Sequence, residues 1–339
     1  MRLSLAILLS VPLAAAAADP TPDAIRAAVA KALPRLWEGI DGHTERRACF
    51  TCHNHAVPLV ALGIARDRGF AVDAKKMDAQ VEFALKHYEA MRQPIARGSG
   101  PGPAPGINLP VGGGVDNTGY AMFAFAGLGV KRNRTTELIA EYTLGARGGT
   151  GAWATVAGRV PSEASSFTTT YLSMHAMREY GKPADAEKIE ARVTVARAWM
   201  LKTPAKDTED RAFKLLGLWL AGGTEAELAV ARKELLDTQL PDGGFAQIEK
   251  REPDAYATGS ALYALHVGGK VKTTDPAYRK GLAFLVKTQK DDGTWHVPTR
   301  SRPIQKYFES GFPYEKDQFI SCAGTGWATA ALALSLPAK

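Results

Sequence analysis

The sequence predicts an all-α fold, an α6/α6 toroid in which an outer ring of helices encloses an inner ring. Two observations support this prediction. Six apolar segments rich in small residues alternate along the chain with six amphipathic segments, and strand-type alternation is nearly absent. The apolar segments also recur along most of the chain, as a repeat architecture requires.

The six apolar segments are predicted to form the inner helices. Several of them start at a threonine and end near a glycine, as residues 118–129 and 258–269 do. Their small side chains let neighbouring helices approach closely, so these helices can be buried on both faces. The six segments span residues 57–69, 118–129, 169–181, 212–223, 258–269 and 325–334.

The six amphipathic segments are predicted to form the outer helices. Apolar residues recur in them at three- and four-residue steps, as Val81, Leu85 and Tyr88 do, so one face can meet the core and the other water. Stacked pairs of helices bury a core that no single repeat could bury, and an open solenoid is the competing arrangement. The segments span residues 22–40, 74–91, 135–144, 185–202, 225–238 and 275–288.

Two of the predicted outer helices end in the same turn. Residues 239–245 and 289–295 share the pattern QxxDGx followed by an aromatic residue, and residues 148–153 look like a degenerate third copy. Asp-Gly is typical of a tight turn. This pattern resembles the QW motif of squalene–hopene cyclases and related toroids, which include the protein prenyltransferases. The resemblance implies a terpenoid-cyclase-like α/α toroid, and the chain also resembles exported bacterial toroid proteins with an N-terminal CxxCH.

The resemblance does not extend to the active sites of these families. Class II cyclases protonate their substrate with a DxDD motif, and residues 254–257 take its place here. Only Asp254 matches, and Tyr256, with an ordinary pKa near ~10, replaces the central proton donor. This argues against class II terpene cyclisation. The zinc site of prenyltransferases needs Asp, Cys and His, and Cys322 and His266 complete no such set.

The first 18 residues are predicted to be a signal peptide. Arg2 supplies a positive charge, residues 3–15 are apolar but short for a membrane span, and Ala16–Ala18 suits a signal peptidase. An uncleaved membrane anchor is the alternative. No later apolar stretch is long enough to cross a bilayer, so we expect residues 19–339 to form a single toroid domain in a periplasmic or extracellular space.

The basic charge of the chain does not indicate nucleic-acid binding. The formal net charge is +7. The lysines and arginines are spread along the chain, without a long basic run or an aromatic-interleaved basic patch. Weak attraction to anionic surfaces is all that the charge implies.

The motif Cys49-x-x-Cys52-His53 carries most of the functional prediction. It is the attachment pattern of covalent c-type haem. Two thiols one helical turn apart would bind the haem vinyl groups, and His53 would be the axial iron ligand. Haem attachment takes place outside the cytoplasm, in agreement with the predicted signal peptide.

Other interpretations of the motif stay open. A Cys49–Cys52 disulfide is one, and a metal site that adds His53 and His55 to the two cysteines is another. A sixth iron ligand is not determined, and the candidates are His43, His87, His175, Met122 and Met174. Cys322 alone is more often a small buried residue than a ligand.

Two long segments and a set of carboxylates complete the candidate site. Residues 93–115 and 295–321 are predicted loops at the rim of the ring, where they could cover a central cavity. Five acidic residues precede inner helices and are expected to cap them, with one or two possible in a cavity wall. They are Asp116, Glu163, Asp210, Asp254 and Asp317.

These observations favour an exported toroid that carries haem c, works in redox or electron transfer with a partner protein, and binds an apolar, isoprenoid-like small molecule in its central cavity. A non-catalytic ligand-binding or scaffold toroid with a Cys49–Cys52 disulfide is the alternative. A glycan hydrolase or lyase is a third hypothesis, but the sequence offers no convincing acid/base pair for it.

Overall fold

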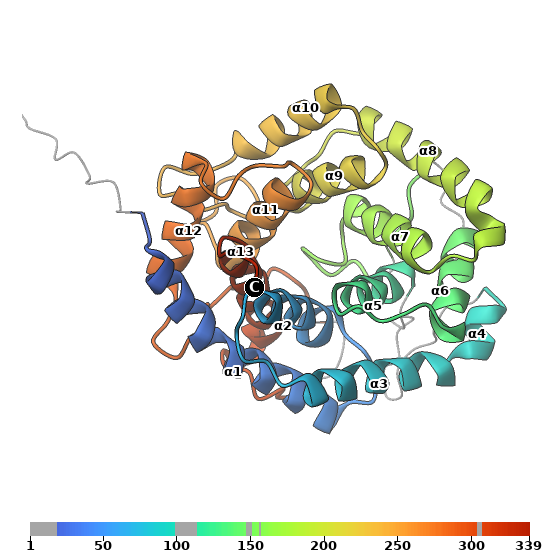
Figure 1. Ribbon diagram of the computed structural model, residues 1–339, viewed down its shortest axis with the longest axis horizontal. Helices are drawn as coiled ribbons and strands as arrows, with labels where there is room; N and C mark the ends of the chain where they lie inside the picture. Colours follow the sequence, from blue (N-terminus) through green and yellow to red (C-terminus); the bar gives the residue numbers. More distant parts are fainter. Residues whose placement is uncertain (1–18, 99–113, 147–150, 156, 304–306) are drawn as a thin grey trace, which may run out of the picture.

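The computed structural model describes residues 19–98, 114–146, 151–155, 157–303 and 307–339, and the predicted signal peptide lies outside these ranges. Within them the chain forms two concentric rings of helices, as Figure 1 shows. The predicted all-α toroid is therefore confirmed.

Inner and outer helices alternate along the chain. The inner ring contains α2 (Val57–Asp67), α5 (Val115–Gly127), α7 (Ser166–Tyr180), α9 (Thr208–Leu220), α11 (Ala255–Val267) and α13 (Gln318–Leu334). The outer ring contains α1 (Pro22–Arg46), α3 (Ala74–Ala90), α4 (Arg92–Ala96), α6 (Arg134–Gly145), α8 (Ala186–Lys202), α10 (Glu225–Leu236) and α12 (Pro276–Thr288). Apart from the short α4, these helices match the predicted segments.

A glycine allows two inner helices to approach closely. A Cβ atom added to Gly259 in α11 would lie 2.4 Å from the backbone carbonyl carbon of Trp327 in α13. Such a distance is far shorter than a normal van der Waals contact, so only glycine fits at this crossing. The small residues of the inner segments therefore set the spacing of the inner ring.

The repeated turn motif closes the ring. The side-chain amide of Gln239 donates to the carbonyl of Ala277 at 2.8 Å and so ties α10 to α12. Gln289 makes the same contact with the carbonyl of Ala28 at 2.8 Å. Because Ala28 lies in α1, this second contact joins the two ends of the domain. The ring is closed, and the open solenoid is excluded.

The aromatic residue of each motif is held in the same way. The backbone N–H of Trp295 donates to Oγ1 of Thr325 at 3.2 Å, and that of Trp153 donates to Oγ1 of Thr170 at 3.1 Å. In both cases the indole N–H donates at 2.9 Å to the carbonyl ten residues earlier. Trp153 therefore ends a genuine third copy, although residues 147–150 lie outside the described ranges.

Aromatic side chains fill the middle of the inner ring. Buried rings from five inner helices contact one another, with centroids 5.2–6.4 Å apart. They belong to Phe123, Tyr171, Phe213, Tyr263 and Trp327. This aromatic plug occupies the level at which an apolar central cavity was expected, so a small molecule must bind elsewhere along the axis.

The two predicted rim segments are partly helical. In residues 93–115, α4 covers the start and α5 begins at Val115, while residues 99–113 lie outside the described ranges. In residues 295–321, α13 begins at Gln318. The loop predictions are therefore wrong at these ends, where helices extend further than the apolar pattern suggested. No described helix combines the length and apolarity needed to cross a membrane.

Candidate functional site

Three inner helices begin on the same face of the ring. The hydroxyl of Ser165, the N-cap of α7, donates at 2.6 Å to Oδ1 of Asp210 in the first turn of α9. The hydroxyl of Tyr256 in the first turn of α11 donates at 3.4 Å to Glu209 of α9. Because helix N-termini carry partial positive charge, this face favours anionic ligands.

The acidic residues expected to cap inner helices have different roles. Asp254 does cap α11, accepting from the N–H of Ala257 at 2.9 Å, and burial raises its pKa to about 6. Asp116 and Asp210 instead lie inside first turns, where Asp207 is the cap of α9. The cap prediction is wrong for these two, because each helix starts a few residues earlier than expected.

Glu209 is a buried carboxyl group at the centre of this face. Its Oε1 accepts from the hydroxyl of Thr168 at 2.9 Å and from that of Tyr256, while Oε2 is buried without a hydrogen-bond partner among the described residues. Burial raises the pKa of Glu209 to about 8. The group is therefore protonated at neutral pH and can act as a proton donor.

The CxxCH segment does not lie on one helix. Thr51 is an N-cap in extended conformation, and a π-helical turn, η1 (Cys52–Ala56), follows it and continues into α2. Cys49 precedes this turn, so the expectation that the two thiols lie one helical turn apart is wrong. The physical reason is the cap at Thr51, whose side chain accepts from the N–H of Asn54 at 3.1 Å.

The two thiols of the motif face different neighbours. Sγ of Cys49 lies 3.8 Å from Nε2 of His43, whereas Sγ of Cys52 lies 3.2 Å from Nδ1 of His53 and 3.9 Å from Oγ of Ser162. All three cysteines of the chain are free thiols in this structure, so the alternative of a Cys49–Cys52 disulfide is not seen.

Cys52 and His53 belong to a buried polar cluster with Arg159 and Glu163. Nη1 of Arg159 lies 3.1 Å from Nε2 of His53, and Nε of Arg159 lies 3.2 Å from Oε2 of Glu163. Burial lowers the pKa of His53 and raises the pKa values of Cys52 and Glu163. Cys52, His53 and Glu163 form the one group of three potential metal ligands found in the described residues.

This geometry does not match covalent haem c. Nε2 of His53, the nitrogen on the outer edge of the ring, already contacts the guanidinium of Arg159 at 3.1 Å. Haem attachment would need that contact to break, and it would need Cys49 and Cys52 to turn toward one macrocycle. The residues as folded therefore fit a single small cation better than a haem.

The other candidate ligands are used elsewhere. Nδ1 of His55 accepts from the N–H of Thr51 at 3.2 Å, so His55 does not join a metal set with the cysteines. His175 packs against Phe123 in the aromatic plug, at a ring distance of 5.4 Å. Met122, Met174 and Cys322 are fully buried, and Sγ of Cys322 fills the space beside Gly39.

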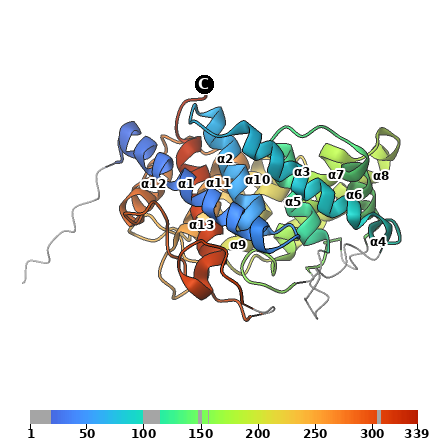
Figure 2. The ribbon, with the colours of Figure 1, turned by 90° about the horizontal axis from the view of Figure 1, so that it is seen from below.

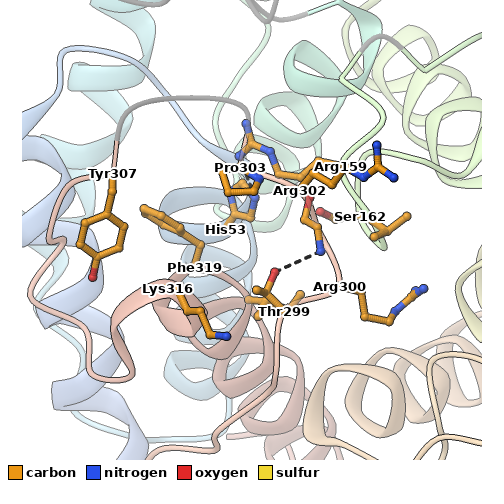
Figure 3. Close-up of a pocket in the computed structure, with 13 residues that line it drawn as sticks. His53, Arg159, Ser162, Thr299, Arg300, Arg302, Pro303, Tyr307, Lys316 and Phe319 are labelled. Carbon is orange, nitrogen blue, oxygen red and sulfur yellow. Dashed lines mark hydrogen bonds between the residues drawn. The ribbon is translucent and has the colours of Figure 1, made fainter.

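A pocket of about 400 Å³ opens beside His53. Its wall contains the segment between α12 and α13, which lies at the edge of the ring opposite the C-terminus in Figure 2. One part of the lining is apolar and comes from Val160, Pro303, Tyr307, Phe319 and Ile320. The other part is cationic and comes from Arg159, Arg300, Arg302 and Lys316. Figure 3 shows Tyr307 and Phe319 on one side, with Arg159, Ser162 and Arg300 on the other. The pocket is therefore amphiphilic.

Arg300 is the most strongly held cation of the pocket. Its Nε donates at 2.7 Å to Oε1 of Gln247, and Gln247 in turn donates to Asp254 at 2.8 Å. Nη2 of Arg300 is buried and has no hydrogen-bond partner among the described residues. Burial lowers the pKa of Arg300, against the nearby charge of Asp207, but a guanidinium keeps its proton. A buried donor without an acceptor is costly, so an anionic ligand in this pocket would relieve it.

Sequence reasoning missed the cations and Glu209. Arg300, Arg302 and Lys316 lie in the rim segment that was singled out for its aromatic residues, so its functional character was recognised but its charge was not. Arg159 and Glu163 are four residues apart in the chain, a spacing that suits an ion pair. Glu209 is surrounded by other acidic residues in the sequence, so its burial left no sequence signal.

No family model matches the sequence. Among solved structures, the chain is similar to the type II terpene cyclase MstE from Scytonema in complex with the product merosterolic acid A, with a TM-score of 0.58 and 14% identity over 93% of this chain and 99% of that chain. A variant of MstE in complex with its substrate geranylgeranyl dihydroxybenzoate gives a TM-score of 0.59 and 13% identity, with the same coverage. A glycosidase in complex with glucose gives a TM-score of 0.56 and 12% identity over 93% and 98% of the two chains. These likenesses show a terpenoid-cyclase-like α/α toroid fold.

Proposed function

We propose that this protein binds an amphiphilic organic anion, an acidic head group on an apolar, isoprenoid-like chain, in the pocket beside His53. The observation that carries the proposal is the buried Nη2 of Arg300, which has no hydrogen-bond partner among the described residues and belongs to a pocket-lining side chain. A carboxylate or phosphate oxygen supplies the missing acceptor, with a charge-assisted bond that is stronger than a neutral one.

The shape of the pocket supports the same class of ligand. Arg302 and Lys316 add exposed positive charge near the head-group position, while Phe319 and Ile320 offer apolar surface for a chain. Pockets of a few hundred Å³ are typical of small-molecule sites. The MstE substrate, geranylgeranyl dihydroxybenzoate, likewise joins a prenyl chain to an acid, which supports the proposal by analogy of fold.

The proposal is tested by comparing two probes that differ only in the head group. Geranyl phosphate and geraniol share one chain, and calorimetry on the purified full chain measures both affinities. We expect the phosphate to bind at least about tenfold more tightly, because hydrogen bonds to charged groups contribute about 1.5–3 kcal/mol. Equal affinities, or binding of the alcohol alone, would contradict an acidic head group and favour a purely apolar ligand.

We also propose that the protein acts outside the cytoplasm. The pattern of residues 1–18 supports this, with a basic start, an apolar stretch and a run of alanines. Expression in a bacterial host, followed by fractionation and N-terminal sequencing, measures the outcome. A periplasmic product that starts at Asp19 is expected. A full-length chain in the cytoplasm would contradict export.

Covalent haem remains a second proposal, supported by the motif of Cys49, Cys52 and His53 and by its position in an export-type sequence. A redox role and a redox partner protein depend on it. Bound haem would supply an electron-transfer centre, with Cys49 and Cys52 as thioether anchors and His53 as the axial ligand. Export in a host competent for c-type haem maturation gives the test: a Soret band and the added mass of one haem support it, and a colourless chain of unchanged mass refutes it.

A further inference from the structure

The cluster around Cys52 has the composition of a metal site. Sγ of Cys52, a ring nitrogen of His53 and a carboxylate oxygen of Glu163 all lie within 4.8 Å of one another. All three residues are buried. Cys52 and His53 come from η1, and Glu163 comes from the segment before α7, so two separate parts of the chain meet here. One thiol, one imidazole and one carboxylate are ligands that zinc accepts.

The position of Arg159 shows that this cluster already attracts a cation. Its guanidinium contacts two of the three groups, with Nη1 3.1 Å from Nε2 of His53 and Nε 3.2 Å from Oε2 of Glu163. A guanidinium can only donate, so both groups turn an electron pair toward the same positive charge. The contact with Glu163 is an ion pair without an aligned hydrogen bond, because both atoms lack a hydrogen-bond partner among the described residues.

We propose that Cys52, His53 and Glu163 bind a divalent metal ion of the zinc class, and that the guanidinium of Arg159 takes the place of this cation in the metal-free protein. Binding converts the Cys52 thiol to a thiolate and releases its proton to solvent, so the sulfur becomes a ligand. Arg159 moves away from His53 and Glu163. Because Arg159 and His53 both line the pocket, it can turn into the pocket, and a fourth metal position faces the same space.

The metal and haem proposals make opposite demands on Cys49. Haem needs the thiols of both Cys49 and Cys52, whereas the metal site needs only Cys52. Sγ of Cys49 faces His43 at 3.8 Å rather than the cluster. Cys49→Ala therefore separates the two, and Cys322→Ala is a second control, because Cys322 is a buried thiol in contact with Gly39.

The test is metal titration of the purified full chain after chelator treatment. Zinc affinity is measured against a chromophoric chelator, and cobalt serves as a spectroscopic probe. We expect one ion per chain and a thiolate-to-cobalt charge-transfer band. Cys52→Ala abolishes that band, and Glu163→Gln weakens zinc binding by at least about tenfold, while Cys49→Ala and Cys322→Ala bind as the wild type does. No zinc binding at micromolar concentration, or a band that depends on Cys49, would overturn the proposal.

Substitution of Arg159 tests the second half of the proposal. Arg159→Gln removes the competing cation, so we expect zinc to bind at least about tenfold more tightly. Arg159→Lys keeps the charge and should leave the affinity near that of the wild type. If Arg159 were needed only to hold the fold, Arg159→Gln would weaken binding instead. Binding of geranyl phosphate is measured on the metal-free protein, so the failure of one proposal leaves the other standing.

Discussion

The hydroxyl of Tyr256 lies 3.4 Å from Oε1 of Glu209, where the starts of α11 and α9 meet inside the ring. Tyr256 occupies the place of the central acid of the cyclase motif, yet its own pKa is raised further by burial and by the charge of Glu209. The acidic proton at this level belongs to Glu209 instead, because burial raises its pKa to about 8. The neutral carboxyl has moved from α11 to α9.

This carboxyl makes stability depend on pH. Its pKa is near 4.5 in the unfolded chain and about 8 in the folded one, so its contribution is full below pH 4.5 and is lost as pH rises toward 8. We expect Glu209→Gln to remove much of this loss. Between pH 5 and pH 8 the wild type should lose at least about 1 kcal/mol more unfolding free energy than the variant does.

Urea denaturation at several pH values measures this difference. Glu187→Gln is the matched control, because Glu187 is exposed on α8 and should leave the pH dependence unchanged. A wild type and Glu209→Gln with parallel pH profiles would mean that Glu209 ionises normally in the folded protein.

Closure of the ring depends on a glycine in the second motif copy. Gly293 has φ +90°, and a Cβ there would lie 2.3 Å from the carbonyl oxygen of Lys31 in α1. Gly222 has φ +72° with nothing within 4 Å of such a Cβ. Gly222→Ala should cost only the backbone term, about 1–2 kcal/mol, and Gly293→Ala clearly more. Thermal unfolding of both variants decides, and equal losses would show that α1 yields without cost.

The degenerate motif copy is predicted to stabilise the ring as the intact ones do. Trp153→Phe removes the indole N–H that donates to the carbonyl of Thr143 at 2.9 Å, and should cost about 1 kcal/mol of unfolding free energy. Trp219→Phe is the control, because Trp219 is only partly buried and its contact with Lys270 is a cation–π one. Chemical denaturation measures both, and equal effects would mean that the Trp153 hydrogen bond contributes nothing.

The exposed cations of the pocket should act at long range. Arg302 and Lys316 are exposed, so their attraction to an anion is screened by salt. Arg302→Gln with Lys316→Gln should weaken geranyl phosphate binding at low salt and leave geraniol binding unchanged. Raising the salt concentration should bring wild type and variant together. A difference that persists in high salt would mean that these side chains contact the head group directly.

The sequence was sufficient for the fold because its signals are local and repeated. Apolar and amphipathic segments, and the turns that end at Phe245 and Trp295, correspond directly to helices and to contacts between them. Helix ends were less predictable: α13 begins at Gln318 rather than near Thr325, because its first two turns are more polar than the rest.

The site was predicted less well because it depends on contacts between distant parts of the chain. The motif identified Cys52 and His53, but their partners Arg159 and Glu163 lie about a hundred residues away in the sequence. The raised pKa of Glu209 comes first from burial, which composition cannot show. The amphiphilic pocket combines η1, the segment before α7 and the rim segment, and none of these forms it alone.

The most direct test of the proposed ligand class is the head-group preference of Arg300→Gln. Calorimetry gives the ratio of geraniol to geranyl phosphate dissociation constants for wild type and variant at one salt concentration. The account predicts a ratio of at least about ten for the wild type and a ratio near one for the variant, because the free donor of Arg300 is lost. A variant that keeps the full preference would contradict the assignment of Arg300 as the anion-binding residue and, with it, the central claim.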